Sequence, residues 1–283
     1  MKEIGLDAAG ISPNAISEPF PLFTEEAIKQ IRAEIFSESV LADCQYSSTF
    51  ASNMIRCYGP ARAPFIFDTW RSPEVLSAIS RIAGIDLIPA IEFETGHVNV
   101  SINERPCGAA NTGYGESSQD IDLQTFAWHF DSYAFVCVVM LSECSGMVGG
   151  ETAIRTGNGE VVKVRGPTMG SAVVMQGRYI EHQALAARGG RERISMVTAF
   201  RPKSPFIRDE TVLTGSRPIS DKYALYGQYT EYRLEILEER LRDQSKRMRE
   251  RQRYNRSLDT SGIRTFLETQ RRFLDAMLLE LTE

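Results

Sequence analysis

The sequence of 283 residues contains five cysteines and no C-x-x-C pair. An odd number of cysteines at irregular spacing argues against both a disulfide framework and a structural zinc site. Reduced thiols are expected instead, with Cys137 in the core because it lies within an apolar run. Residues 1–10 lack the apolar stretch of a signal peptide. Together these absences predict a cytoplasmic protein.

Long apolar runs and an excess of basic residues are also absent. The longest apolar run, residues 134–141, is far too short to cross a bilayer, so no membrane segment is expected. Acidic residues outnumber basic ones by 37 to 32, which gives a formal net charge of −5. Nucleic-acid-binding proteins are more often basic, so a nucleic-acid partner is not expected.

Three segments of different character follow one another, and we expect them to form one integrated unit. Residues 1–84 predict an extended arm and then helices that begin at the capping residues Thr24 and Ser72. Residues 85–205 contain short strand-like runs separated by turn-forming residues, which is typical of a barrel or sandwich. Residues 206–283 are highly charged, with apolar positions at helical spacing.

The predicted fold is therefore a mainly β core with flanking α-helices and a C-terminal helical hairpin. The hairpin would either pack on the barrel or form a homodimer contact. Basic residues at 246–256 are interspersed with acids, which favours a solvated helix face over a binding surface. Residues 107–122 are rich in glycine and small polar residues and predict a loop, either a lid over a substrate or a plain surface insertion.

Histidine is scarce, yet two of the three histidines fit a metal-binding pattern. His129 and Asp131 are two residues apart, so on a strand their side chains share one face. His182 can complete the set from a neighbouring strand. Two neutral imidazoles and one carboxylate leave three adjacent coordination positions open, as in non-haem Fe(II) oxygenases. An H-x-D motif alone is weak evidence, because single histidines more often have a structural role.

A second pair of residues makes the metal pattern more specific. Arg193 and Ser195 follow His182 and share strand parity. A 2-oxo acid can chelate iron and leave one position for O₂, but its far carboxylate then needs a cation with fixed donors. A guanidinium suits this role because it pairs with a carboxylate in a bidentate way. The pattern thus predicts Fe(II), O₂ and a 2-oxo acid with a second carboxylate as the reacting groups.

The motifs H-F-D at 129–131, His182 and R-I-S at 193–195 resemble those of the iron(II)- and 2-oxoglutarate-dependent dioxygenases. Gly-Gly-Glu-Thr at 149–152 and the strand-like run at 170–175 are similar to segments of the prolyl-hydroxylase-like branch. The resemblance covers roughly residues 90–202. It implies a double-stranded β-helix, or jelly-roll barrel, as the fold.

The same resemblance assigns residue roles. It implies that His129, Asp131 and His182 bind iron and that Arg193 and Ser195 bind 2-oxoglutarate. Family halogenases typically have a small residue in place of the aspartate, so halogenation is not expected here. W-H-F-D-S-Y and the later G-R-Y-I-E-H-Q-A-L also look like fungal dioxygenases of small-molecule biosynthesis, some of which oxidise amino acids. A small-molecule substrate is therefore expected.

Residues near the motifs are weaker candidates. Asn99, on an alternating strand, could line the co-substrate pocket or lie on an outer, solvated face. His97 shares its parity, and we expect a structural role for it because iron needs no third histidine.

Arg155, Tyr133 and Trp128 are candidates for substrate contacts, as is Arg178. A surface position is the commoner fate of an arginine, and core packing accounts equally well for the aromatic residues. Two other functions remain open. One is a metal hydrolase with the same three ligands, which would leave Arg193 and Ser195 without a role. The other is a non-catalytic binding barrel.

Overall fold

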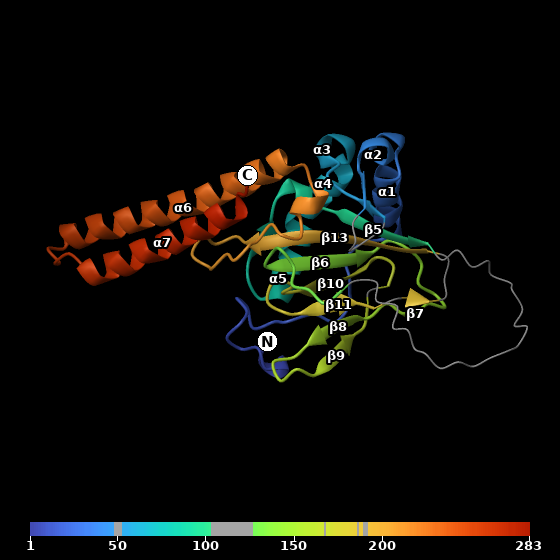
Figure 1. Cartoon of the computed structure of the whole chain (residues 1–283), viewed down its shortest axis with the longest axis horizontal. Helices are drawn as coiled ribbons and strands as arrows, with labels where there is room; N and C mark the ends of the chain where they lie inside the picture. The colour runs from blue at the N-terminus through green and yellow to red at the C-terminus, as the bar shows by residue number, and fades with distance from the viewer. Residues whose placement is uncertain (48–52, 103–126, 167, 186, 189–191) are drawn as a thin grey trace, which may run out of the picture.

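The protein has a mainly antiparallel β-sheet core with flanking helices (Figure 1), as seen in a computed structural model. The structure describes residues 1–47, 53–102, 127–166, 168–185, 187–188 and 192–283. The predicted loop at 107–122 lies outside these residues. The mainly β core with flanking helices agrees with the sequence-based prediction.

One large sheet forms the centre of the molecule, and its paired strands are antiparallel. Its order is β1 (Phe20–Pro21), β10 (Ser171–Met175), β6 (Phe135–Met140), β13 (Glu192–Pro202), β5 (His97–Ile102), β3 (Met54–Ile55) and β2 (Gln45–Tyr46), and β4 (Leu87–Pro89) also pairs with β13. Residues from the N-terminal segment thus add short strands to both ends of the sheet. The division at residues 84 and 205 stays a prediction.

A smaller sheet carries one of the histidines. Its order is β11 (His182–Ala184), β8 (Thr152–Arg155) and β9 (Val161–Val164), while β7 (Val148–Gly149) pairs with β12 (Ala187–Arg188). Gly159 lies in the turn between β8 and β9 with a positive φ, a conformation that glycine adopts at no steric cost.

Helices from the N-terminal segment cover one face of the large sheet. They are α1 (Glu25–Ile35), α2 (Glu38–Asp43), α3 (Gly59–Arg62), α4 (Pro64–Arg71) and α5 (Pro73–Ala83). Elsewhere in the chain, short 3₁₀ turns lie at Lys2–Ile4, Glu92–Glu94 and Arg217–Ile219. The hydroxyls of Thr24 and Ser72 accept hydrogen bonds from Ala27 N and Val75 N at 3.2 and 3.3 Å. Both predicted helix starts are therefore confirmed.

The strand register divides the large sheet into two faces with different chemistry. Cross-strand partners share a face, so Val98, Ile194 and Met196 lie on the helix-covered side, where they pack into the main core with Trp70 of α4. The opposite face carries His97, Asn99 and Ser101 of β5 beside Val197, Ser195 and Arg193 of β13. The polar face of β5 is therefore not covered by the N-terminal helices.

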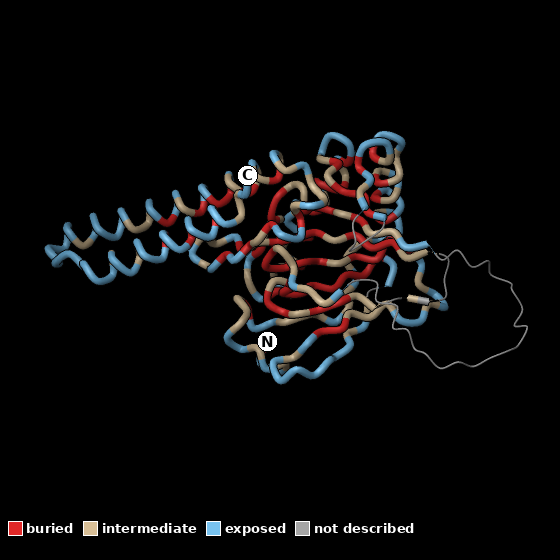
Figure 2. Tube along the Cα trace, viewed as in Figure 1, coloured by how far each residue is buried: buried red, intermediate tan, exposed pale blue. Residues whose placement is uncertain are grey.

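Two long C-terminal helices form the predicted hairpin, α6 (Lys222–Arg253) and α7 (Thr260–Glu280). The hairpin begins against the β-sheet core and then projects away from it (Figure 1). Near the β-sheet core, Leu225 and Tyr229 of α6 and Phe273 of α7 pack with Tyr133 in a second core. The distal half of the hairpin is mostly exposed (Figure 2). No helix among the described residues is both long and apolar enough to span a membrane.

Candidate metal centre

Backbone pairing brings the two motif histidines side by side. His182 begins β11, which pairs with β8 on one side. On the other side of β11, His182 and His129 exchange two backbone hydrogen bonds. The distances from His129 N to His182 O and from His182 N to His129 O are 3.0 and 2.9 Å. Asp131 N donates to Gly177 O at 2.9 Å, so residues 129–131 run along residues 177–182. The local pairing therefore converts a separation of about fifty residues into direct contact.

The side chains of these three residues converge on one point. His129 Nε2 lies 3.5 Å from Asp131 Oδ1, and His182 Nε2 lies 3.6 Å from Asp131 Oδ2. The three potential ligand atoms are all within 4.8 Å of one another, and no other such group of three or more occurs among the described residues. These separations suit a single ion bound about 2 Å from each ligand atom.

Hydrogen bonds orient both imidazoles for metal binding. His129 Nδ1 lies 2.8 Å from Ala127 O, and His182 Nδ1 lies 2.9 Å from Ile180 O. A carbonyl can only accept, so each Nδ1 carries the proton and each Nε2 presents a lone pair towards the aspartate. Outer hydrogen bonds of this kind fix ligand orientation in metal centres.

The charge state of the centre also fits a divalent cation. Burial opposes ionisation of Asp131, but the adjacent imidazoles of His182 and His129 outweigh it and hold its pKa below the usual value. Burial lowers the pKa of His182, which favours the neutral ligand form. Asp131 Oδ2 is buried and has no hydrogen-bond partner among the residues that the structure describes. A buried, ionised oxygen without a partner is costly unless a cation completes it.

Gly177 is a part of the centre that the motifs do not reveal. A Cβ added at this position would lie 1.7 Å from Asp131 Oδ2 and 2.6 Å from its Cγ. The Asp131 carboxylate therefore occupies the space that any side chain at residue 177 would need. The backbone carbonyl of Gly177 also accepts a hydrogen bond from the Asp131 N–H, so Gly177 positions the aspartate in two ways.

The residues expected to bind a 2-oxo acid share one sheet face. Ser195 lies opposite Asn99, and Arg193 lies opposite Ser101, so all four side chains are on the face away from the N-terminal helices. Asn99 is thus on the same face as Ser195 and not on the helix-covered side. Ser195 is buried.

Arg193 is a desolvated guanidinium with no hydrogen bond or ion pair in the described part of the chain. Burial lowers the pKa of Arg193. The nearly buried arginines Arg56 and Arg233 differ, because their guanidiniums pair with Glu94 and Asp209 at 2.7 and 3.1 Å. Among the described residues, no carboxylate pairs with Arg193.

His97 lies close to the metal triad without joining it. It shares the face of Asn99 and interacts electrostatically with Asp131. Burial, helped by Arg56, lowers the pKa of His97 to about 4, so the ring is neutral. Its Nδ1 lies 3.8 Å from Glu94 Oε2, too far for a hydrogen bond. The expected structural role of His97 stays a prediction.

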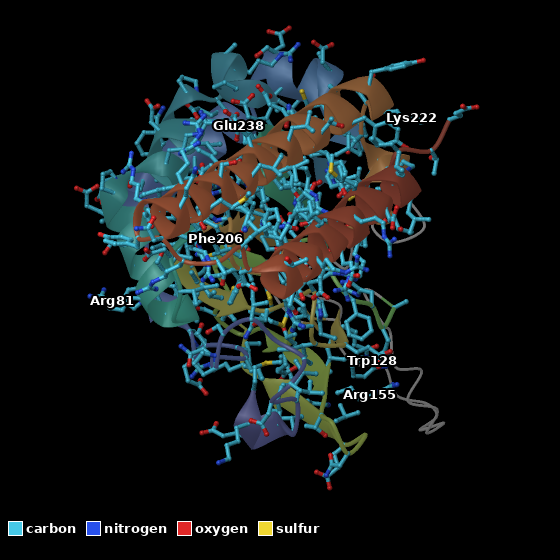
Figure 3. The ribbon with its side chains drawn as sticks, turned by 90° about the vertical axis from the view of Figure 1, so that its left-hand side faces the viewer. Arg81, Trp128, Arg155, Phe206, Lys222 and Glu238 are labelled. Carbon is cyan, nitrogen blue, oxygen red and sulfur yellow. The ribbon has the colours of Figure 1, made fainter. Side chains whose placement is uncertain are left out.

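The candidate substrate residues already have protein partners. The Arg155 guanidinium lies 4.7 Å from the centre of the Trp128 ring and 3.0 Å from Glu181 (Figure 3). Trp128, Arg155 and Glu181 are each one residue from an inward-facing position, at His129, Ile154 and His182, so strand alternation turns them to the other side.

Two further candidates lie in the second core and at the surface. Tyr133 is buried against α6 in the second core. Arg178 donates to Glu210 O at 2.8 Å on the surface. A substrate contact of any of the four stays a prediction.

Comparisons with known proteins give structural likeness only. No family model and no curated protein matches the sequence. A prolyl-4-hydroxylase from Pseudomonas putida is 18% identical and covers 68% of this chain and 94% of its own, with a TM-score of 0.43. A prolyl hydroxylase from Trichoplax adhaerens, in complex with a hypoxia inducible factor peptide, is 12% identical and covers 68% and 85%, with a TM-score of 0.46.

A third similar structure is the epimerase SnoN in complex with Fe³⁺, α-ketoglutarate and nogalamycin RO. It is 12% identical and covers 68% of this chain and 80% of its own, with a TM-score of 0.47. The structures similar to this chain come from the iron(II)- and 2-oxoglutarate-dependent oxygenase family, and the chain carries a His-Asp-His triad. At these low identities and scores, we argue the function from the residues of the chain itself.

Proposed function

We propose that this protein is an Fe(II)- and 2-oxoglutarate-dependent dioxygenase that oxidises an unactivated C–H bond of a small molecule. The observation that carries the proposal is the convergence on one point of two Nε2 atoms and a buried carboxylate oxygen that has no hydrogen-bond partner within the described ranges. The proposal includes a double-stranded β-helix as the fold of the core. It also includes residues 85–205 as the catalytic barrel between N-terminal and C-terminal helical segments.

The triad residues would hold the iron. His129 and His182 would bind through Nε2, because their Nδ1 atoms are engaged with backbone carbonyls. Asp131 would supply one carboxylate oxygen and neutralise part of the ion's charge. This set leaves open positions for two further ligands, the 2-oxo acid and O₂.

Arg193 and Ser195 would hold 2-oxoglutarate. The Arg193 guanidinium, which pairs with no carboxylate in the described part of the chain, would pair with the far carboxylate, and the Ser195 hydroxyl would add a donor. Asn99, opposite Ser195, could hydrogen-bond the same molecule. An ion pair between Arg193 and the far carboxylate would offset the desolvation cost of the buried guanidinium. The co-substrate would therefore be bound more tightly than by an ion pair at the protein surface.

With iron, 2-oxoglutarate and O₂ bound, the cofactor set supplies an oxidant strong enough to remove hydrogen from an unactivated carbon. The residues of the chain fix the position of the reactants and keep water away. Val138 and Met140 of β6 pair with Val197 and Ser195 across the sheet, so apolar side chains flank the polar positions of the inner face. Substrate placement would decide between hydroxylation, desaturation and cyclisation.

We propose an amino acid or a secondary-metabolite intermediate as the substrate and the cytoplasm as the place of action. The proposal for the substrate rests on the motif resemblance. The free thiols of Cys44, Cys57, Cys137 and Cys144 suit a reducing compartment.

The test combines a candidate substrate panel with two readouts. O₂ consumption and succinate formation should rise together when the correct substrate is added to the Fe(II) protein with 2-oxoglutarate. His129→Ala and Asp131→Ala should abolish both. Full turnover by either variant would contradict the assignment. Substrate turnover without O₂ or 2-oxoglutarate would favour a metal hydrolase instead.

A further inference from the structure

One side of α6 carries a row of apolar residues that are about half exposed. Leu234, Leu241 and Met248 are 50%, 44% and 40% exposed and are spaced seven residues apart. The buried side of α6, which includes Tyr229 and Ile236, lies about half a turn away around the helix. Apolar residues at a seven-residue spacing are typical of a helix that packs along another helix.

Charge is divided along the same helix. Residues 222–239 contain two basic and four acidic residues, whereas residues 240–253 contain seven basic and two acidic residues. The first half of α6 is therefore negative and the second half strongly positive. An antiparallel second copy of α6 would place each half against its opposite charge.

The pairing is self-complementary residue by residue. On one flank of the exposed row, acids occur only before residue 241 and bases only after it. Three acid–base pairs share a midpoint near residue 240, and these are Glu231 with Arg249, Glu235 with Lys246, and Glu238 with Arg242. The apolar row has nearly the same midpoint, because Leu234 and Met248 are symmetric about Leu241.

A two-fold axis perpendicular to two antiparallel helices brings the same flank of each helix together. It would therefore join Leu241 to its copy, Leu234 to Met248, and each acid to the matching base. Glu238 already pairs with Arg242 one helical turn later in its own chain. In the dimer the two such pairs would form a network of four charges at the centre of the contact.

We propose that the protein forms a two-fold dimer in which α6 packs antiparallel against α6 of a second copy. The hairpin projects from the β-sheet core (Figures 1 and 2), and the half-exposed Leu234, Leu241 and Met248 are accessible to a partner. Three apolar residues from each copy form a small interface, so the expected dissociation constant is in the micromolar range, roughly 1–100 µM.

Analytical ultracentrifugation of the full chain tests the proposal. The mass should rise from 31.7 kDa towards twice that value as concentration increases. Leu234→Glu with Leu241→Glu should weaken association at least about tenfold. Leu279→Glu, at an exposed leucine of α7, is the matched control and should associate like the wild type. Circular dichroism checks that all variants stay folded.

A charge exchange identifies the antiparallel register. Glu231→Arg with Glu238→Arg makes the flank basic, and Arg242→Glu with Arg249→Glu makes it acidic, so each variant alone should be monomeric. An equimolar mixture should recover the dimer mass. A wild-type protein that stays monomeric up to about 500 µM would overturn the proposal. So would a mixture that remains monomeric, or dissociation caused by Leu279→Glu alone.

Discussion

Replacing Gly177 with alanine should displace Asp131 and weaken metal binding while leaving the fold intact. The added Cβ would lie 1.7 Å from Asp131 Oδ2, whereas such contacts are essentially never shorter than 3.0 Å. The carboxylate oxygen must therefore move by at least 1.3 Å, the difference between these two distances. Metal–ligand distances tolerate only about 0.2 Å of variation, so the displaced carboxylate would no longer be a ligand in this geometry.

The expected loss follows from that displacement. Changes to groups that only orient a ligand cost about 10–100-fold in metal affinity. Displacing the ligand itself should reach the upper end, a loss of about 100-fold or about 2.7 kcal/mol. Gly177 does not have the positive φ that would require glycine, so alanine adds no backbone strain at this position.

Anaerobic calorimetric titration with Co(II), together with thermal unfolding of the metal-free protein, measures both effects. Gly227→Ala is the matched control, because a Cβ at Gly227 would meet nothing within 4 Å. In an Asp131→Ala background, Gly177→Ala should cause no further loss of affinity, since the displaced group is already absent. Metal affinity within twofold of the wild type in Gly177→Ala would refute the reasoning.

Three further results are expected. Arg193→Ala should raise the 2-oxoglutarate concentration needed for half-saturation without changing Co(II) affinity, and an unchanged requirement would remove Arg193 from the co-substrate site. Glu94→Gln should destabilise the fold by about 3–5 kcal/mol in urea unfolding, because Arg56 would keep a buried charge without a counter-charge; a loss below about 1 kcal/mol would contradict this. Burial opposes protonation of His129, but hydrogen bonding to Asp131 outweighs it and raises the pKa above 6.5. Protons should therefore compete with Co(II) as pH falls through that raised pKa, and equal affinities at pH 8 and pH 6 would exclude such competition.

Local sequence patterns predicted the elements that position the candidate site. Alternation in β13 predicted the shared face of Arg193 and Ser195, because strand geometry repeats every two residues. It left the face of Asn99 open, and the pairing of β5 with β13 places Asn99 on that same face. Helix starts at Thr24 and Ser72 followed from side-chain capping, which depends on neighbouring residues alone. These features need no knowledge of distant contacts.

Other features depend on contacts between distant segments. The two-residue strands β1, β2 and β3 are too short to leave a pattern, and they form because the edges of the sheet accept them. The role of Gly177 depends on Asp131, which approaches it only in the folded chain.

Strand alternation would have placed Trp128 on the opposite side from His129. It would not have placed Tyr133, because the chain bends at residues 132–134.

Anaerobic titration of 2-oxoglutarate into the Fe(II) protein tests the central claim most directly. Chelation of iron by the keto oxygen and adjacent carboxylate should produce a visible charge-transfer absorption in the wild type. The absorption should be absent in Asp131→Ala and should require more 2-oxoglutarate in Arg193→Ala. No absorption at saturating iron and 2-oxoglutarate in the wild type, or equal absorption in Asp131→Ala, would contradict the account.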